Sequence, residues 1–328
     1  MMLKFVMLLP RDAKSVTLGK SMKYSKAIVT GGAGFIGSHL CDALVKAGCK
    51  VIVIDKETPS EERRNALVQY EQCDIRDAVV RQIFIDEAPE IVFHLAAHAD
   101  DRESVREPVM NAENNIIGML NVLEAARMVG VKKVVFASTG VVYGQAENRP
   151  TSEDELPQPL TPYAVSKLAG ERYLHCYRAL YALDYVALRL SNVYGPRQDG
   201  SKECGAIAIF TRKLLAGEAV IINNDGLTTR DYVYVGDVVA ALMLAAESEV
   251  NGVYNIGTGV ETTTRELLAM VADEIGVTPG EVARSEVKDE VKYVALGSMK
   301  ARSELGWESA MRLGEGVAST IAWYKNRL

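Results

Sequence analysis

Short apolar runs alternate with helical segments through the first 190 residues of this chain. Each run has the length of a buried strand, and the segments between the runs have helical length and composition. The predicted strands are 27–30, 51–54, 91–95, 134–137 and 185–190, and the predicted helices are 38–47, 115–129 and 163–181. Alternation of this kind requires right-handed crossovers. The pattern therefore predicts an α/β fold with a doubly wound parallel sheet and helices on both of its faces.

The alternation breaks down after residue 190. Residues 195–232 hold a Gly-Pro turn, a charged loop, one helix and a short strand, whereas 233–248 and 253–256 return to the sheet. A helix over 266–275 and a charged stretch follow. We therefore expect two lobes whose chain interleaves. The expected divisions are an N-terminal extension of 1–25, a larger lobe of 26–190 with about 233–258, and a smaller C-terminal lobe of 191–232 with 259–328.

Composition excludes several classes of protein. With 328 residues, of which 48% are hydrophobic, the chain can bury a large core and is not disordered. A net charge of −6 argues against a general role in binding nucleic acid. The five cysteines form no Cys-x-x-Cys pair, which predicts reduced thiols in the cytoplasm. The apolar run from Leu3 to Leu9 is too short to span a membrane, so no membrane association is expected. A degenerate signal peptide is the alternative for this run.

The four histidines do not suggest a metal site. No two of them have the spacing of metal ligands. His94 lies in an apolar predicted strand and is expected to be a hydrogen-bonded structural residue rather than a catalyst. No metal is therefore predicted.

A glycine-rich run from Gly31 to Gly37 joins the first predicted strand to the first predicted helix. Glycines here let the backbone turn tightly and approach a pyrophosphate, which the N–H groups of the helix N-terminus then bind. Asp55 ends the second strand about 20 residues further on, where a carboxylate accepts a hydrogen bond from a ribose 2′-hydroxyl group. The same carboxylate would repel a 2′-phosphate. This unit predicts a dinucleotide site that favours NAD over NADP.

A tyrosine and a lysine four residues apart are the candidate catalytic pair. Thr161 is a good N-cap and Pro162 suits the first helical position, so a helix begins here. On that helix Tyr163 and Lys167 share one face near the positive end of the helix dipole, and both influences favour a phenolate. A base active near neutrality needs a pKa shift of roughly 3 units from the ordinary tyrosine value. Taken alone, an ordinary amphipathic pair explains this spacing better, so the rest of the chain decides.

Several motifs together carry a family resemblance. They are Thr-Gly-Gly-Ala-Gly-Phe-Ile-Gly at 30–37, Asp-Ile-Arg-Asp at 74–77, His-Leu-Ala-Ala at 94–97, Ser138-Thr139 before Tyr143-Gly144, and Tyr163 to Lys167. With these motifs, residues 26 to about 310 resemble the extended short-chain dehydrogenase/reductase superfamily, which has a Rossmann fold. The segments 206–210 and 225–235 resemble UDP-glucose 4-epimerases and their near relatives.

The resemblance implies that the larger lobe binds NAD and that the smaller lobe binds a nucleotide diphosphate sugar. The residues implied at the cofactor are Gly31, Gly34, Phe35, Ile36, Gly37, Asp55, Asp74, Ile75, Leu95, Ala96, Ala97, Asn114, Ser138, Tyr163 and Lys167. The implied catalytic residues are Tyr163, Lys167 and Thr139, and the implied substrate contacts are Thr139, Tyr163, Asn192 and Arg230. Plainer alternatives are a turn residue at Asn192, a surface ion pair at Arg230 and a backbone-bonded hydroxyl at Thr139.

The implied activity is that of an NAD-dependent isomerase. UDP-glucose or UDP-galactose would be oxidised to a 4-keto sugar and reduced from the opposite face, which gives the C4 epimer. The open alternatives are epimerisation of UDP-glucuronate or a UDP-N-acetylhexosamine, a related dehydration or decarboxylation, and an NAD-binding sensor. Dehydratases carry Thr-Asp-Glu-Val-Tyr-Gly where this chain has Thr-Gly-Val-Val-Tyr-Gly at 139–144, which argues against dehydration. Retention of Thr139, Tyr163 and Lys167 argues against a sensor.

The chain departs from its relatives near the C-terminus. Many relatives carry Arg-Pro-Gly-Glu there, with the arginine on the diphosphate, and this chain has Val-Lys-Asp-Glu at 287–290. Arg284 and Lys288 are the alternatives for that contact. Val294 falls near a position that limits the size of the sugar's C2 substituent. The resemblance also implies a homodimer that forms through two long helices, 107–129 and 162–181.

Overall fold

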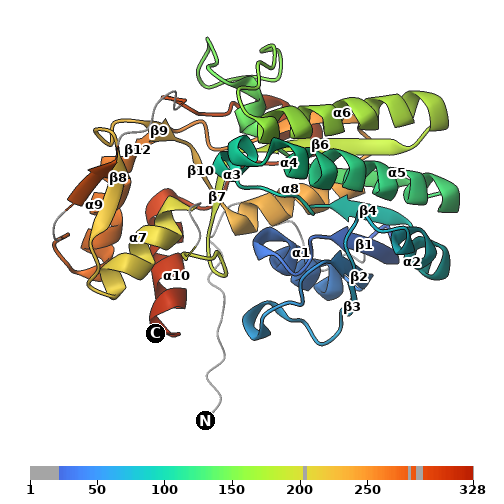
Figure 1. The fold of residues 1–328 in the computed structure, drawn as a ribbon, viewed down its shortest axis with the longest axis horizontal. Helices are drawn as coiled ribbons and strands as arrows, with labels where there is room; N and C mark the ends of the chain where they lie inside the picture. Colours follow the sequence, from blue (N-terminus) through green and yellow to red (C-terminus); the bar gives the residue numbers. More distant parts are fainter. Residues whose placement is uncertain (1–21, 202–204, 280–281, 286–290, 328) are drawn as a thin grey trace.

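Seven parallel strands form the central sheet of the protein (Figure 1). The computed structural model describes residues 22–201, 205–279, 282–285 and 291–327. The strands are β1 (Lys26–Thr30), β2 (Lys50–Asp55), β3 (Gln69–Gln72), β4 (Ile91–His94), β5 (Lys133–Thr139), β6 (Asp184–Leu190) and β11 (Gly252–Ile256). Their order across the sheet is β11-β6-β5-β4-β1-β2-β3, so the chain winds outward from β1 in both directions. The predicted doubly wound parallel sheet is confirmed.

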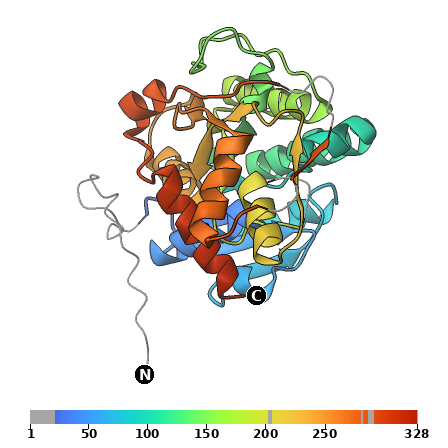
Figure 2. The same ribbon diagram turned by 90° about the vertical axis from the view of Figure 1, so that its left-hand side faces the viewer.

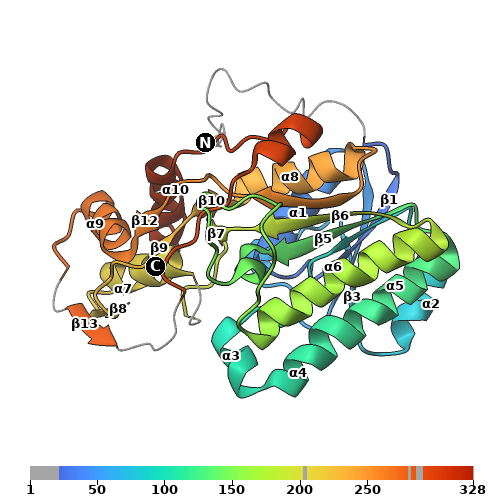
Figure 3. The ribbon, with the colours of Figure 1, turned by 90° about the horizontal axis from the view of Figure 1, so that it is seen from above.

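Helices cover both faces of this sheet (Figure 3). On one face lie α1 (Phe35–Lys46) and α8 (Val235–Glu247), and on the other lie α2 (Val79–Glu87), α5 (Gly118–Val129) and α6 (Pro162–Tyr181). Successive side chains of a strand point to opposite faces. In β1, Val29 joins the core under α1 and α8, and Ile28 joins the core under α2, α5 and α6. The inner strands are continuously apolar because both of their faces are buried.

A second group of helices packs beside the sheet around its own apolar core (Figures 1 and 2). It contains α7 (Ala206–Leu215), α9 (Thr264–Ile275) and α10 (Leu313–Lys325). Three short strand pairs accompany them: β7 (Asn192–Tyr194) with β10 (Tyr232–Tyr234), β8 (Val220–Asn223) with β13 (Val282–Ser285), and β9 (Thr229–Arg230) with β12 (Thr262–Thr263). The chain enters this group after β6, returns to the sheet in α8 and β11, and enters the group again in β12.

Short helical segments fill the connections. The helices α3 (Asp101–Arg106) and α4 (Pro108–Ala112) lead into a π-helical segment, η2 (Glu113–Ile117), which continues into α5. Single 3₁₀ turns are η1 (Glu61–Arg63) and η3 (Gly140–Tyr143), and a second π segment is η4 (Ala301–Leu305). The run from α4 through η2 to α5 therefore forms one long helix beside α6 (Figure 3).

Several expectations concern features outside the sheet. Residues 1–21 of the expected N-terminal extension and Cys204 lie outside the described residues, while Tyr24 is buried against the core just before β1. The other four cysteines have free thiols. None of the described helices combines the length and the apolar character that a membrane crossing needs. Within the same residues, no three His, Cys, Asp or Glu side chains gather as metal ligands would.

Candidate functional site

The turn between β1 and α1 lies where the two halves of the sheet diverge. Gly31, at the end of β1, has a φ of +74°, and a Cβ atom there would lie 2.6 Å from the backbone nitrogen of Ala96, just beyond β4. A Cβ atom at Gly37 would lie 2.2 Å from the carbonyl oxygen of Gly31. Both positions therefore require glycine. In open α/β sheets, ligands bind beyond the carboxyl ends of the strands at the point where the strand order reverses. Here that point lies between β1 and β4.

The N-terminus of α1 suits an anion. Its N-cap residue, Gly34, has no side chain that could accept hydrogen bonds from the first-turn amides, and the first turn holds no acidic residue. The N–H donors and the positive end of the helix dipole are therefore left for a ligand. The side chains of Phe35 and Ile36 pack against the core of α7, α9 and α10, so a ligand would meet their backbone amides. The turn and the helix end fit the pyrophosphate of a dinucleotide.

Two acidic groups lie beyond the ends of β2 and β3. Asp55 accepts hydrogen bonds from the backbone nitrogens of Ala33 at 3.0 Å and Glu57 at 3.1 Å, and burial raises the pKa of its carboxyl. Asp74 accepts two side-chain hydrogen bonds from Arg76, which lower the pKa of the Asp74 carboxyl. The side chain of Ile75 is buried in the core, so only its backbone remains for an adenine. Asp55 is thus oriented beside the glycine turn, as a residue that binds the ribose of a dinucleotide would be.

The end of β4 completes the lining of this region. The amide of Leu95 donates to the carbonyl of Thr30, and the amide of Ala96 donates to the Thr30 hydroxyl at 3.3 Å. The same hydroxyl lies 2.7 Å from Nδ1 of His94, whose burial lowers the pKa of its imidazole to about 3. His94 is thus buried and hydrogen-bonded, as expected of a structural residue. Leu95, Ala96 and Ala97 are half-buried next to Gly31, where a cofactor channel was expected.

Asparagines on the long helix beside α6 hold the loop after β4. Asn114 donates to the carbonyl of Met110 at 2.7 Å. Its neighbour Asn115 is buried, accepts from the amide of His98 at 2.7 Å and donates to the hydroxyl of Ser166 on α6 at 3.0 Å. Asn115 was not predicted from the sequence. The structure places it in a π-helical segment, and such segments are frequent at functional sites. It links the loop after β4 to the helix that carries Tyr163.

The start of α6 has the predicted geometry. Thr161 accepts from the amide of Ala164 as the N-cap residue, and Pro162 occupies the first turn. The Nζ atom of Lys167 lies 5.9 Å from the ring centre of Tyr163 and donates to the carbonyl oxygen of Ala137 on β5 at 2.8 Å. The two side chains therefore share one face of α6, directed at the end of β5.

Lys167 is buried, with 3% of its surface exposed. Burial lowers the pKa of its ammonium to about 7, and the charge of Glu171, one turn later on α6, acts in the opposite direction. The candidate hydroxyl, Thr139, ends β5 as the N-cap of η3 and accepts from the amide of Val141 at 3.4 Å. Its neighbour Ser138 is bonded to Glu171 at 2.6 Å. Tyr163, Lys167 and the end of β5 are thus brought together beside the switch point of the sheet.

The expected substrate residues lie on β7 and β9. Asn192 has an exposed side chain, and its backbone N–H donates to the backbone carbonyl of Asp231. Arg230 is half-buried on β9 and donates to the carbonyl of Thr229 at 2.8 Å. Burial raises the pKa of the Asp101 carboxyl on α3, and the nearby charge of Arg230 acts in the opposite direction. Because Asp101 also lies 2.5 Å from the Thr161 hydroxyl, Arg230 is placed near the N-terminus of α6.

Three residues discussed for the substrate lie further along. Lys288 and the side chain of Arg284 are outside the described part of the chain. Val294 is half-buried just before Ala295 and Leu296, which are buried. Leu296 in turn packs on η3. Val294, the residue expected to limit the size of the sugar's C2 substituent, is therefore two residues from a contact with the segment that follows Thr139.

A model described as the NAD dependent epimerase/dehydratase family matches residues 27–257. The chain belongs to this family. A curated UDP-glucose 4-epimerase of Mycolicibacterium smegmatis is 40% identical, over 92% of this chain and 99% of that protein. The structure of the Thermotoga maritima UDP-glucose 4-epimerase with UDP-glucose is 43% identical, with a TM-score of 0.89 over 92% of this chain and 99% of that one. The structure of the Thermus thermophilus UDP-glucose 4-epimerase in complex with NAD is 40% identical. Its TM-score is 0.88, over 92% of this chain and 100% of that one.

The glycine turn makes a direct prediction for this NAD-dependent family member. Gly31→Ala should abolish the NAD content of the purified protein, because the added Cβ atom meets the backbone after β4 at 2.6 Å. Gly48→Ala is the matched control: its φ is +81°, but a Cβ atom there meets nothing within 4 Å. The control should lose only about 1–2 kcal/mol of stability from its backbone conformation and retain NAD. NAD released by heat denaturation measures both, and equal NAD contents would contradict a cofactor site at Gly31.

Proposed function

We propose that this enzyme inverts C4 of a UDP-hexose, converting UDP-glucose and UDP-galactose into each other with tightly bound NAD. The observation that carries the proposal is the buried Lys167 ammonium, which lies between the Tyr163 ring and the end of β5. An ammonium in this position favours the phenolate that a base requires. Similarity to UDP-glucose 4-epimerases over nearly the whole chain supports the same activity.

In the proposed mechanism, Tyr163 removes the proton of the sugar's C4 hydroxyl group while the Thr139 hydroxyl shares its hydrogen bond. Bound NAD would supply the hydride acceptor for the carbon-bound hydrogen and, once reduced, the hydride donor for the return step. Lys167 stabilises the phenolate and would hold the nicotinamide ribose of the cofactor. When the 4-keto sugar presents its other face, Tyr163 returns the proton to the oxygen, and the C4 epimer results.

Proposed cofactor contacts follow the edge formed by the ends of β1, β2 and β4. The glycine turn with the amides of Phe35 and Ile36 holds the pyrophosphate, and Asp55 holds the ribose. Asp74 and Ile75 would hold the adenine, and Leu95–Ala97 would line the nicotinamide half. Asn114 and Ser138 complete the site. NAD is the expected cofactor because a carboxylate at Asp55 excludes a 2′-phosphate.

Substrate binding is divided between strong and weak contacts in this proposal. The smaller lobe, 191–232 with 259–328, anchors the nucleotide diphosphate, and the larger lobe, 26–190 with about 233–258, holds NAD. Arg230 and Asn192 bind the diphosphate, since guanidinium groups form strong charge-assisted hydrogen bonds with phosphates. A firm anchor with few contacts to the sugar lets the 4-keto sugar turn over while the nucleotide stays bound.

Dehydration is disfavoured by the structure of η3. Dehydratases need an additional acid and base beside the keto sugar, and η3 offers only Gly140, Val141, Val142 and Tyr143. Tyr143 donates to Asn255 at 2.8 Å and accepts from Arg189 at 2.7 Å, so its hydroxyl is committed to buried partners. Epimerisation needs no further acid–base pair, which makes it the function that this site supports best.

The activity is tested with purified protein and no added NAD. UDP-galactose should be converted into UDP-glucose until both are present at a constant ratio. A panel of UDP, GDP, TDP and CDP sugars, with N-acetylhexosamines and uronic acids included, defines the substrate. Inversion of another sugar but not of UDP-galactose would correct the substrate, and binding of NAD without any turnover would contradict the proposed function.

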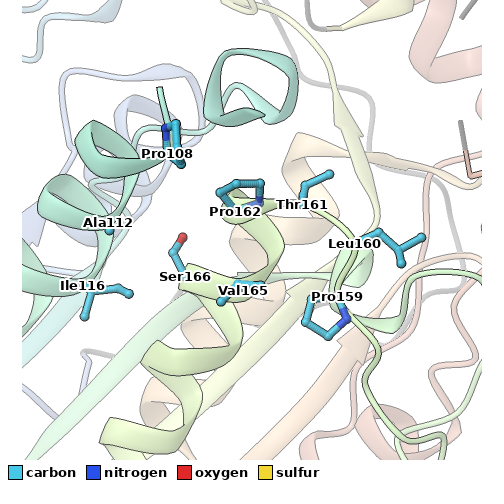
Figure 4. Close-up of a pocket in the computed structure, with 9 residues that line it drawn as sticks. All are labelled: Pro108, Ala112, Ile116, Pro159, Leu160, Thr161, Pro162, Val165 and Ser166. Atoms are coloured by element: carbon cyan, nitrogen blue, oxygen red, sulfur yellow. The ribbon is translucent and has the colours of Figure 1, made fainter. Parts of the chain in front are cut away.

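We further propose that the enzyme is a homodimer, in which two copies pair through α6 and the long helix beside it. A groove of about 380 Å³ opens between α4 and the start of α6 (Figure 4). It is lined by Pro108, Ala112, Ile116, Pro159, Leu160, Thr161, Pro162, Val165 and Ser166. Around it Val109, Ile117 and Val165 are exposed. A contiguous exposed apolar face of this kind marks a protein interface, and a two-fold pairing would cover it.

The dimer is tested by sedimentation equilibrium, where twice the mass of one chain is expected. Val165→Lys should shift the protein toward monomers, because it places a charge in the centre of the apolar face. Val277→Lys, an exposed valine just after α9, should leave the dimer intact. A monomeric wild-type protein would contradict the proposal.

A further inference from the structure

A buried ion pair lies behind the candidate catalytic residues. Glu171 on α6 and Arg189 on β6 are only 3% and 4% exposed. The Nε and Nη2 atoms of Arg189 donate to the two carboxylate oxygens of Glu171 at 2.9 and 2.7 Å. A buried ion pair often stabilises a fold no better than apolar residues of the same size, because both charges lose their hydration. Stability alone is therefore a weak explanation for this pair.

The pair is bonded to both ends of the segment that carries Thr139. Ser138, directly before Thr139, donates from Oγ to the Glu171 carboxylate at 2.6 Å. At the far end of η3, the hydroxyl of Tyr143 accepts from Nη1 of Arg189 at 2.7 Å. Ser138 and Arg189 are also directly paired across β5 and β6. Thr139 thus lies, along the chain, between two residues whose side chains are bonded to the ion pair.

The same pair faces the buried ammonium of Lys167. Lys167 donates to the carbonyl of Ala137, and Glu171 accepts from Ser138, so α6 is bonded to β5 at two successive residues. The distance from Lys167 to Glu171 is one helical turn on a single face. Any displacement of Glu171 would therefore move the lysine and the Thr139 segment together.

The titratable groups around Lys167 come from its own helix and from two strands. On α6 they are Tyr163 and Glu171, on β4 it is His94, and on β6 it is Arg189. His94 is neutral, because burial and the nearby Lys167 charge lower its pKa to about 3. On β5 the contact is the carbonyl of Ala137, which is uncharged. Glu171 is the group whose charge raises the pKa of Lys167 against burial.

We propose that Glu171 and Arg189 form a positioning unit for the reaction, in which Glu171 orients both the Thr139 segment and the Lys167 ammonium. The pair bonds none of the reacting atoms and acts through the side chains that it holds. Its effect on turnover rests on the proposed function, whereas its effect on Lys167 does not.

Glu171→Gln is the first test, because the amide keeps the size of the carboxyl but has no charge. We expect kcat to fall roughly 10-fold or more, as for a misplaced catalytic group, while the KM of the nucleotide sugar changes less than about two-fold. Without the negative charge, Lys167 loses its proton at a lower pH. The alkaline limb of the kcat profile should therefore move to lower pH, which a purely structural role would not cause.

A second readout does not depend on turnover. In protein labelled with ¹³C at the lysine side chains, NMR follows the titration of Lys167. The signal of Lys167 is assigned as the one that is missing from Lys167→Met. The titration midpoint should fall by about 1 unit in Glu171→Gln. An unchanged midpoint together with wild-type kcat would overturn the inference. A wild-type enzyme that turns over no nucleotide sugar would instead refute the proposed function, and the titration would still test the positioning unit.

A double variant guards against an unfolded Glu171→Gln protein, and a matched control accompanies it. Glu171→Leu with Arg189→Met replaces both charges by apolar groups, which buried pairs often tolerate without loss of stability. This double variant should fold and show the same fall in kcat and in the Lys167 midpoint, and wild-type values would overturn the inference. Tyr177→Phe is the matched control, since it removes a 2.6 Å hydrogen bond from α6 to Glu124 on α5, ten residues after Lys167. It should change neither kcat nor the titration.

Discussion

Replacing Tyr163 with phenylalanine is expected to lower kcat for C4 inversion at least ~100-fold, with little change in the KM of the nucleotide sugar. The substitution removes only the phenolic oxygen. The aromatic ring keeps its place at the start of α6, 5.9 Å from the Lys167 ammonium. Backbone contacts of the residue, such as the bond from its amide to the Ser104 hydroxyl at 3.1 Å, also remain. The variant therefore isolates the proton transfer from the packing.

The matched control is Tyr181→Phe, at the other end of the same helix. The ring of Tyr181 packs against the guanidinium of Arg127, a contact that phenylalanine retains. This control should turn over like the wild-type enzyme. Wild-type turnover in Tyr163→Phe would remove the phenol from the mechanism, even if the NAD content and the fold were as proposed.

The sheet was predictable from the sequence because its inner strands are buried on both faces. A short apolar run that lies between helical segments, such as 51–54, is typical of a buried strand. The edge strand β3 was not predicted. Its sequence is Gln-Tyr-Glu-Gln, and its side chains stay half-buried or exposed, so no apolar run marks it. Helix α2 was missed for a similar reason, since only Val80 and Phe84 of its nine residues are buried.

In the candidate site, the parts set by local geometry were predictable. The helix start at Pro162 fixes the face shared by Tyr163 and Lys167, and the glycine run fixes the turn after β1. Contacts between distant segments were not predictable in this way. Asn115 bonds Ser166 across 51 residues, and no local pattern marks that pairing.

The buried ion pair did leave a signal in the sequence. Arg189 interrupts the apolar strand Tyr-Val-Ala-Leu-Arg-Leu, and a charge inside a buried strand requires a buried partner. Glu171 follows Lys167 by four residues and is therefore on the face of α6 that carries Tyr163 and Lys167. Each residue alone is compatible with many partners, and only the register of β5 with β6 shows that the two meet beside Ser138.

At Lys167, activity and stability are expected to change in opposite directions. Burial lowers the pKa of the folded protein's ammonium to about 7, whereas an exposed lysine in the unfolded chain titrates near ~10.4. Between these values the unfolded state binds more protons, so the stability of the protein should rise with pH in this window. At neutral pH the folded protein is therefore destabilised by a buried ammonium that the proposed mechanism requires.

Lys167→Met removes this charge and fills a similar volume. We expect kcat to fall at least ~100-fold, because Tyr163 loses the ammonium that favours its phenolate. The free energy of unfolding in urea at pH 7 should rise by roughly 1–3 kcal/mol, after allowance for the Ala137 carbonyl that loses its donor. The rise in stability between pH 7 and 10 should flatten. Protein stripped of NAD is used for this measurement, since bound NAD would add its own stabilisation.

Lys133→Met is the matched control, because Lys133 is a second buried lysine whose pKa burial also lowers. Its ammonium, however, donates to the carbonyl oxygens of Ala245, Ser248 and Val250 at the C-terminal end of α8. Acceptors at a helix C-terminus stabilise a cation, so this variant should lose roughly 1–3 kcal/mol of stability and keep its kcat. Opposite signs at the two lysines would show that the ammonium of Lys167 is retained for catalysis at a loss of stability. If Lys167→Met were destabilised as much as Lys133→Met and remained active, the buried ammonium would be structural and the proposed role of Lys167 wrong.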